Sequence, residues 1–98
     1  MSTISTALSG MNAAWMQIGV SGHNIANTMT PGFHRQQVQQ SALPEGGVQA
    51  EVSTAAEAGD ALAEDIVNQM AASVIYRANA QTLRTQSQLS GSLIDVLA

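Results

Sequence analysis

The chain of 98 residues contains no cysteine and no lysine, and only 10% of its residues are charged. Without cysteine, neither a disulfide framework nor a thiolate metal site can form. Three arginines and a pI near 4.7 provide no basic patch for nucleic acid or an anionic membrane. No run of about 18 apolar residues occurs, so no membrane span is predicted. The first 20 residues contain no Lys or Arg before an apolar run, so we expect no secretory signal peptide.

Bulky side chains for a globular core are also scarce. Trp15, Phe33 and Tyr76 are the only aromatic residues, and alanine supplies much of the 45% hydrophobic content. A compact chain of this length buries only about 60–70% of its unfolded surface. The composition therefore favours thin contacts between long helices, or contacts with other subunits, over a thick core.

The N-terminal segment, residues 1–27, is predicted to be one long helix. Its apolar residues recur at alternating steps of four and three, which is the spacing of a heptad line. That line consists of Ile4, Leu8, Met11, Trp15, Ile18, Gly22 and Ile25. Ser2 or Thr3 can cap the helix start. The helix should end near Asn27, because the residue before Pro31 is biased toward an extended conformation.

The C-terminal segment, residues 60–98, is predicted to be a second helix that starts near Asp60. One apolar line contains Leu62, Ile66, Tyr76, Ala80, Leu83, Ile94 and Leu97, and a second contains Ile75, Leu89, Leu93 and Val96. Two adjacent lines on one helix indicate contact with more than one neighbour. Asp60, Glu64 and Asp65 crowd the helix start, where the helix dipole favours negative charge.

The middle segment, residues 28–59, is rich in turns. Thr30-Pro31-Gly32 predicts a tight turn in which glycine adopts positive φ. The segments 33–40 and 48–52, separated by a turn at 44–47, are compatible with a short β-hairpin. We therefore expect a single domain over residues 1–98 of all-α class: an elongated antiparallel helical hairpin with coiled-coil-like terminal helices and a short extended or β-hairpin middle segment.

Motifs in both terminal segments closely resemble those of one protein family. Ser21–Asn27 (SGHNIAN) followed by Thr28–Phe33 (TMTPGF) is similar to the N-terminal signature of flagellar rod and hook proteins. The upstream segment Ala7–Met11 also resembles the start of that signature. Glu64–Met70 and Tyr76–Ala80 are similar to the closing helix of that family. Because the middle segment lacks the large inserted domain of hook and distal rod proteins, the chain looks like the short proximal rod proteins.

The resemblance implies a non-enzymatic structural subunit of the bacterial flagellar basal body. In that family the terminal helices pair as a coiled coil and line a tubular assembly. Subunits are made in the cytoplasm, travel unfolded through the flagellar type III export apparatus without a cleaved signal peptide, and build the rod that spans the periplasm. The implied partners are other copies, other rod proteins and the export apparatus, with no nucleic acid, small-molecule substrate or cofactor.

The candidate functional residues form two groups. The first comprises residues expected at helix-packing interfaces: Ile4, Leu8, Met11, Trp15, Ile18, Ile25, Ile66, Met70, Leu83, Leu89, Leu93 and Leu97. The second is the turn motif that the resemblance indicates: Asn27, Thr30, Pro31, Gly32 and Phe33. No catalytic or metal-binding residue is predicted, because His23 and His34 lack a carboxylate cluster beside them. The alternative function is a soluble rod-like adaptor or regulator of flagellar assembly that never polymerises.

Overall fold

Two long helices and a β-hairpin make up the chain, and the structure, a computed structural model, describes residues 2–97. The elements in chain order are α1 (Thr3–Ala26), β1 (Gln36–Ala42), β2 (Val48–Thr54) and α2 (Leu62–Leu97). Both predicted helices are confirmed. Ser2 is the N-cap of α1, and its hydroxyl accepts a hydrogen bond from the backbone N–H of Ser5 at 3.1 Å.

The predicted all-α class is wrong, because the hairpin is a full structural layer and the fold is α+β, with 62% helix and 15% strand. The two seven-residue strands pair antiparallel from Gln36↔Thr54 to Ala42↔Val48. Val38, Val48 and Ala50 are half-buried. A two-stranded hairpin is marginal in water, and packing along α1 stabilises this one.

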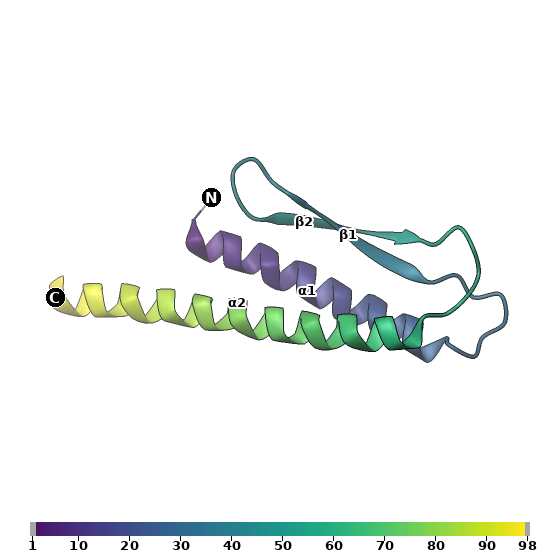
Figure 1. Cartoon of the computed structure of the whole chain (residues 1–98). Helices are drawn as coiled ribbons and strands as arrows, with labels where there is room; N and C mark the ends of the chain where they lie inside the picture. The colour runs from purple at the N-terminus through teal and green to yellow at the C-terminus, as the bar shows by residue number, and fades with distance from the viewer. Residues whose placement is uncertain (1, 98) are drawn as a thin grey trace.

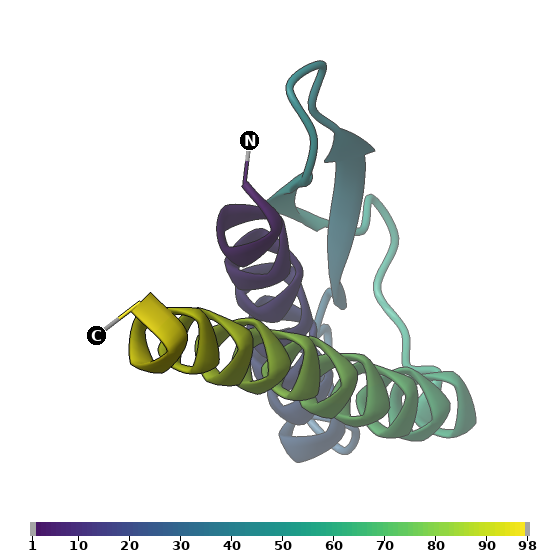
Figure 2. The same ribbon diagram turned by 90° about the vertical axis from the view of Figure 1, so that its left-hand side faces the viewer.

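Helix α1 is the central element of the molecule. In Figure 1 the hairpin runs along one side of α1, and α2 runs antiparallel to α1 along the other. Figure 2, which looks toward the N-terminal end of α1, separates the hairpin and α2 on different sides of that helix. The molecule measures 63 × 25 × 14 Å, and its radius of gyration is 17.3 Å. A compact domain of this length would have a radius of gyration of about 13 Å, so the chain is elongated.

Small side chains form the core. The buried apolar residues are Ala7, Ala13, Ala14, Val20 and Ala72. Along α1 the residues nearest α2 and the hairpin follow heptad steps of three and four: Ala7, Gly10, Ala14, Gln17, Ser21 and Asn24. This line precedes the predicted line of bulky residues by one residue. A Cβ atom on Gly10 would lie only 2.8 Å from the Asn79 amide, so the absent side chain permits the close approach of α2.

Helix α2 continues well beyond its partner helix. Its 36 residues extend over about 54 Å, whereas the 24 residues of α1 extend over about 36 Å. Figure 1 shows the C-terminal end of α2 projecting past the N-terminal end of α1. Every side chain from 87 to 96 is exposed. Neither described helix combines the length and apolar character that a membrane span requires.

Candidate functional site

A buried asparagine joins the three layers of the fold. Asn24, in the last turn of α1, is only 2% exposed. Its amide pairs with the backbone of Gln36 as a neighbouring strand would: Nδ2 donates to the Gln36 carbonyl and Oδ1 accepts from the Gln36 N–H, both at 2.9 Å. Nδ2 also donates to Oδ1 of Asp65 at 3.2 Å. One side chain of α1 thereby fixes the start of β1 and the first turn of α2.

An ion pair completes this cluster. Asp65, 2% exposed, receives two hydrogen bonds from the guanidinium of Arg35: Nε donates to Oδ2 at 3.1 Å, and Nη2 donates to Oδ1. The hydrogen bonding of its guanidinium to the Asp65 carboxylate is the main reason why the pKa of Arg35 lies above its ordinary value. A bidentate pair of this kind fixes orientation as well as distance. Asp65 is therefore a long-range tether, beyond the helix-dipole role predicted for it.

Every buried polar side-chain atom among the described residues has a hydrogen-bond partner. The fully buried Ser21 hydroxyl, for example, accepts a hydrogen bond from Nε2 of Gln17 at 2.8 Å. Buried polar groups that have hydrogen-bond partners hold neighbouring helices and strands in one arrangement. Any other arrangement would leave a buried polar group without a partner, which costs free energy. The cluster of Asn24, Arg35 and Asp65 fixes the relative positions of α1, β1 and α2, and we name these three residues the lock. Among the described residues, no group of three or more His, Asp or Glu side chains could hold a metal ion.

The turn motif ends α1 and reverses the chain. Asn27 is the C-cap, and its side-chain amide donates to the His23 carbonyl at 2.9 Å while its Oδ1 accepts from the Thr30 hydroxyl at 3.2 Å. The Phe33 N–H closes the turn on the Thr30 carbonyl, with Pro31 inside it and Gly32 at φ +72°. The positive φ predicted for Gly32 is confirmed.

The last residue of this motif connects the turn to its surroundings. The Phe33 and His23 rings pack in an edge-to-face arrangement at a centroid distance of 5.3 Å. Its carbonyl accepts a hydrogen bond from the Gly59 N–H at 3.1 Å, just ahead of α2. The motif therefore positions the end of α1, the entry to β1 and the lead-in to α2 together.

Bulky apolar side chains lie outside the small-residue core, on the side of α1 away from Asn24. We name the residues around two adjacent hollows here the Trp15 surface: Leu8, Met11, Asn12, Trp15, Ile18, Gln69, Met70, Ser73, Val74, Tyr76 and Arg77. The hollows have volumes of about 440 and 360 Å³. Trp15 is 66% exposed, and its ring centroid lies 6.0 Å from that of Tyr76.

The structure distributes the predicted packing residues unevenly. Half-buried are Met11, Ile18, Ile25 and Leu83. Exposed are Ile4, Leu8, Trp15, Ile66, Met70, Leu89 and Leu93. The side chain of Leu97 lies outside the described part of the chain. Within one subunit the helices thus pack mainly through smaller neighbours, and a role for the bulky residues between subunits stays a prediction.

The accessible surface is large for a single domain, and many bulky apolar side chains lie on it. The accessible surface is 6492 Å², whereas a compact monomer of 10.2 kDa has about 5300 Å². Val67, 62% exposed, lies three residues before Met70 and extends the apolar part of the Trp15 surface along α2. Contiguous apolar patches on monomers mark interaction sites, and exposed Trp, Tyr and Arg are the residue types that dominate binding energy at interfaces.

Sequence reasoning missed the lock residues Asn24 and Arg35. One signal was available for Asn24, because it opens the Asn24–Asn27 motif in which a role was assigned only to Asn27. Arg35 carried no signal, because its partner lies 30 residues away.

Comparison with known proteins adds no relative. No protein-family model matches the chain, and no curated protein matches it.

Proposed function

We propose that this chain is a structural subunit of the bacterial flagellar basal-body rod, which assembles by covering its exposed helix faces with neighbouring subunits. The motifs at both ends support the proposal because they resemble those of rod and hook proteins. In this proposal the partners are further copies and other rod proteins, and the export apparatus delivers the subunit.

One observation carries the proposal: the chain places its small residues inside and its bulky residues outside. Ala7, Ala14 and Ala72 are buried, while Trp15 and Met70 are 66% and 65% exposed. Burial of a bulky apolar side chain contributes about 1.5–3 kcal/mol, so this arrangement leaves much of the available hydrophobic stabilisation unused in one subunit. Association recovers that stabilisation. A subunit that must associate with several neighbours has a use for such a surface, whereas a self-sufficient monomer has none.

The lock supports the same function. A subunit that repeats many times needs its helices at fixed relative positions, because a small angular error in each copy accumulates along an assembly. The hydrogen bonds of Asn24 and the ion pair between Arg35 and Asp65 hold α1, β1 and α2 at one end. At the other end of the hairpin, the Ser9 hydroxyl accepts a hydrogen bond from the Val48 N–H at 3.1 Å.

The test is whether the chain is present in detergent-extracted basal bodies of the cells that make it. We expect the wild-type chain there and a strong reduction for Trp15→Glu, which places a charge in the Trp15 surface without touching the core. Gln49→Glu is the control, because Gln49 is an exposed polar residue of the hairpin and lies outside that surface.

The outcome also separates the proposed function from its alternative. A chain that remains in the cytoplasm, never enters basal bodies and is insensitive to Trp15→Glu would contradict the rod proposal. That result would favour the soluble adaptor instead.

A further inference from the structure

The outer edge of strand β1 presents backbone groups with which another strand can pair. In an antiparallel pair, successive residues point their backbone N–H and C=O groups alternately toward the partner strand and away from it. The Ala55 N–H donates to the Arg35 carbonyl at 2.7 Å, one step before the first register pair of the two strands. The backbone groups of Gln36, Val38 and Gln40 therefore point away from β2.

The first of these edge positions is already paired as it would be in a wider sheet. The Asn24 amide donates to the Gln36 carbonyl and accepts from the Gln36 N–H, both at 2.9 Å. Among the described residues, no group pairs with the outward backbone groups of Val38 or Gln40. Strand β1 also contains no charged residue and no proline, which are the residues that commonly protect a sheet edge. The edge is therefore open from Val38 onward, and the Asn24 amide marks its closed end.

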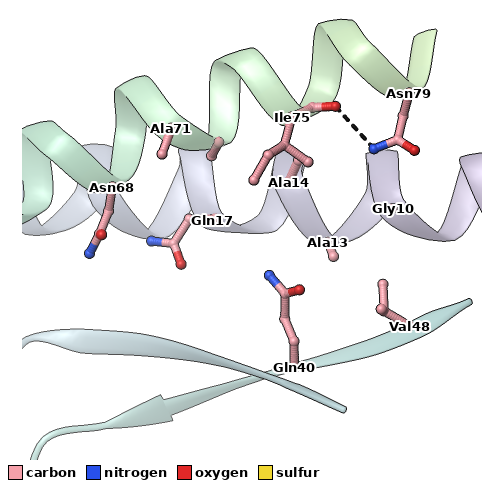
Figure 3. Close-up of a pocket in the computed structure, with 11 residues that line it drawn as sticks. Gly10, Ala13, Ala14, Gln17, Gln40, Val48, Asn68, Ala71, Ile75 and Asn79 are labelled. Carbon is pink, nitrogen blue, oxygen red and sulfur yellow. Dashed lines mark hydrogen bonds between the residues drawn. The ribbon is translucent and has the colours of Figure 1, made fainter. Parts of the chain in front are cut away.

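A polar hollow of about 210 Å³ lies beside this edge. Residues 35–39 line it, and the helices contribute Gln17 of α1 and Glu64, Asp65 and Asn68 of α2. In Figure 3, Gln17 and Asn68 point from the two helices toward the hairpin. Amide side chains both donate and accept hydrogen bonds, so they suit the backbone of an extended segment on the β1 edge.

The charge of the hollow favours a basic segment. Arg35 and Asp65 form an ion pair and neutralise each other. The remaining charge in the wall is the exposed carboxylate of Glu64. A Lys or Arg side chain on the added strand complements this carboxylate, and complementary charges select one partner over another.

We infer that the β1 edge binds an extended segment of another protein, which carries a Lys or Arg beside Glu64. In strand addition of this kind, hydrogen bonds to the main chain supply the affinity and side-chain contacts supply the specificity. A second copy of this chain does not offer such a segment. It has no lysine, Arg35 is held in the lock, and Arg77 and Arg84 lie in α2. The inference does not depend on the proposed function, because it concerns the hairpin edge and not the exposed helix faces.

Fluorescence anisotropy of a dye-labelled peptide with the full-length chain tests the inference. The probe is a short peptide of alternating threonine and valine with one central arginine, because β-branched residues favour an extended conformation. We expect saturable binding, and replacement of the arginine by glutamate should lower the affinity at least about fivefold.

N-methylation of the peptide backbone tests the pairing on the wild-type chain, so the result does not depend on the folding of any variant. Successive N–H groups of an extended strand point to opposite sides. We expect a single N-methyl group to lower the affinity at least about tenfold at alternate positions of the peptide, and less than about twofold at the positions between them.

Two proline variants test which edge of the hairpin binds the peptide. Val38 and Val52 lie opposite each other in the hairpin, and their outward N–H groups lie on opposite edges. Proline removes this N–H without breaking a hydrogen bond between β1 and β2. We expect Val38→Pro to weaken peptide binding at least about tenfold, and Val52→Pro, the matched control, to leave it unchanged. Glu64→Gln should abolish the preference for the arginine peptide over a glutamine peptide, and it should leave the affinity for the glutamine peptide unchanged.

Several results would overturn the inference. They are N-methyl effects without the two-residue period, equal affinities of the two proline variants, and no saturable binding up to about 1 mM peptide. Self-association of the wild-type chain that Val38→Pro removes would also overturn it, because that result would assign the β1 edge to a second copy.

Discussion

Replacement of Asn24 by alanine should destabilise the protein severely. The change removes two hydrogen bonds to the Gln36 backbone and one to the Asp65 carboxylate. A neutral hydrogen bond contributes about 0.5–1.5 kcal/mol and a bond to a charged group about 1.5–3 kcal/mol, so we expect a loss of about 2.5–6 kcal/mol. The whole chain of 98 residues should have a stability of only about 5–15 kcal/mol. Asn24→Ala therefore removes a large share of it.

Asn27→Ala is the matched control for this prediction. Asn27 belongs to the same motif and also makes two side-chain hydrogen bonds, but both are exposed to solvent. Its loss should cost about 1 kcal/mol or less. Urea unfolding followed by circular dichroism, with linear extrapolation to water, gives both free energies of unfolding. If the two variants differ by less than about 0.5 kcal/mol, Asn24 does not act as a lock.

Three further perturbations test the lock, the helix contact and the turn. Asp65→Leu should cost about 1.5–3 kcal/mol because it leaves the half-buried Arg35 guanidinium without its carboxylate. Adding Arg35→Met should recover most of that loss in urea unfolding, and a double variant as unstable as the single one would contradict this. Gly19→Ala should raise the free energy of unfolding by about 0.5–1 kcal/mol, since the added Cβ meets nothing within 4 Å. Gly10→Ala should raise the free energy of unfolding by less, because its added Cβ collides with an α2 side chain. Equal thermal shifts for the two variants would argue against the close contact between the helices. Gly32→Val should lower stability by about 1–3 kcal/mol through strain at φ +72°, and Gly32→Asn by clearly less; a valine variant as stable as the asparagine variant would be inconsistent with the turn.

The sequence predicts the elements of this fold better than their packing. Helical periodicity, the Ser2 cap and the Pro31–Gly32 turn locate both helices and the chain reversal, because these signals act over a few residues. The turn residues located the hairpin correctly, but they did not indicate that it forms a separate layer and makes the fold α+β. Local patterns do not show that Asn24 and Ser9 attach the hairpin to α1 through hydrogen bonds to the backbone of Gln36 and Val48.

The choice of buried face on α1 shows why periodicity alone is insufficient. Two heptad lines run side by side, one through bulky residues such as Trp15 and one through small residues such as Ala14. Spacing identifies both lines but does not say which of them the subunit buries. The bulky line is the natural choice for a monomer, whereas the structure buries the small line. The pairing of Arg35 with Asp65 was also out of reach, because it joins segments that come together only in the folded chain.

The fluorescence of Trp15 provides the most direct test of the claim that the exposed bulky side chains serve contacts between subunits. Trp15 is the only tryptophan, and it is 66% exposed in the single chain. Its emission should be recorded over an approximately hundredfold range of protein concentration, with sedimentation of the same samples to measure association. We expect the emission maximum to move to shorter wavelength as larger species form, and we expect Gln49→Glu, at an exposed polar position of the hairpin, to leave this shift unchanged. Emission that stays at the wavelength of a solvated indole while the protein associates, or a chain that remains monomeric throughout, would contradict it.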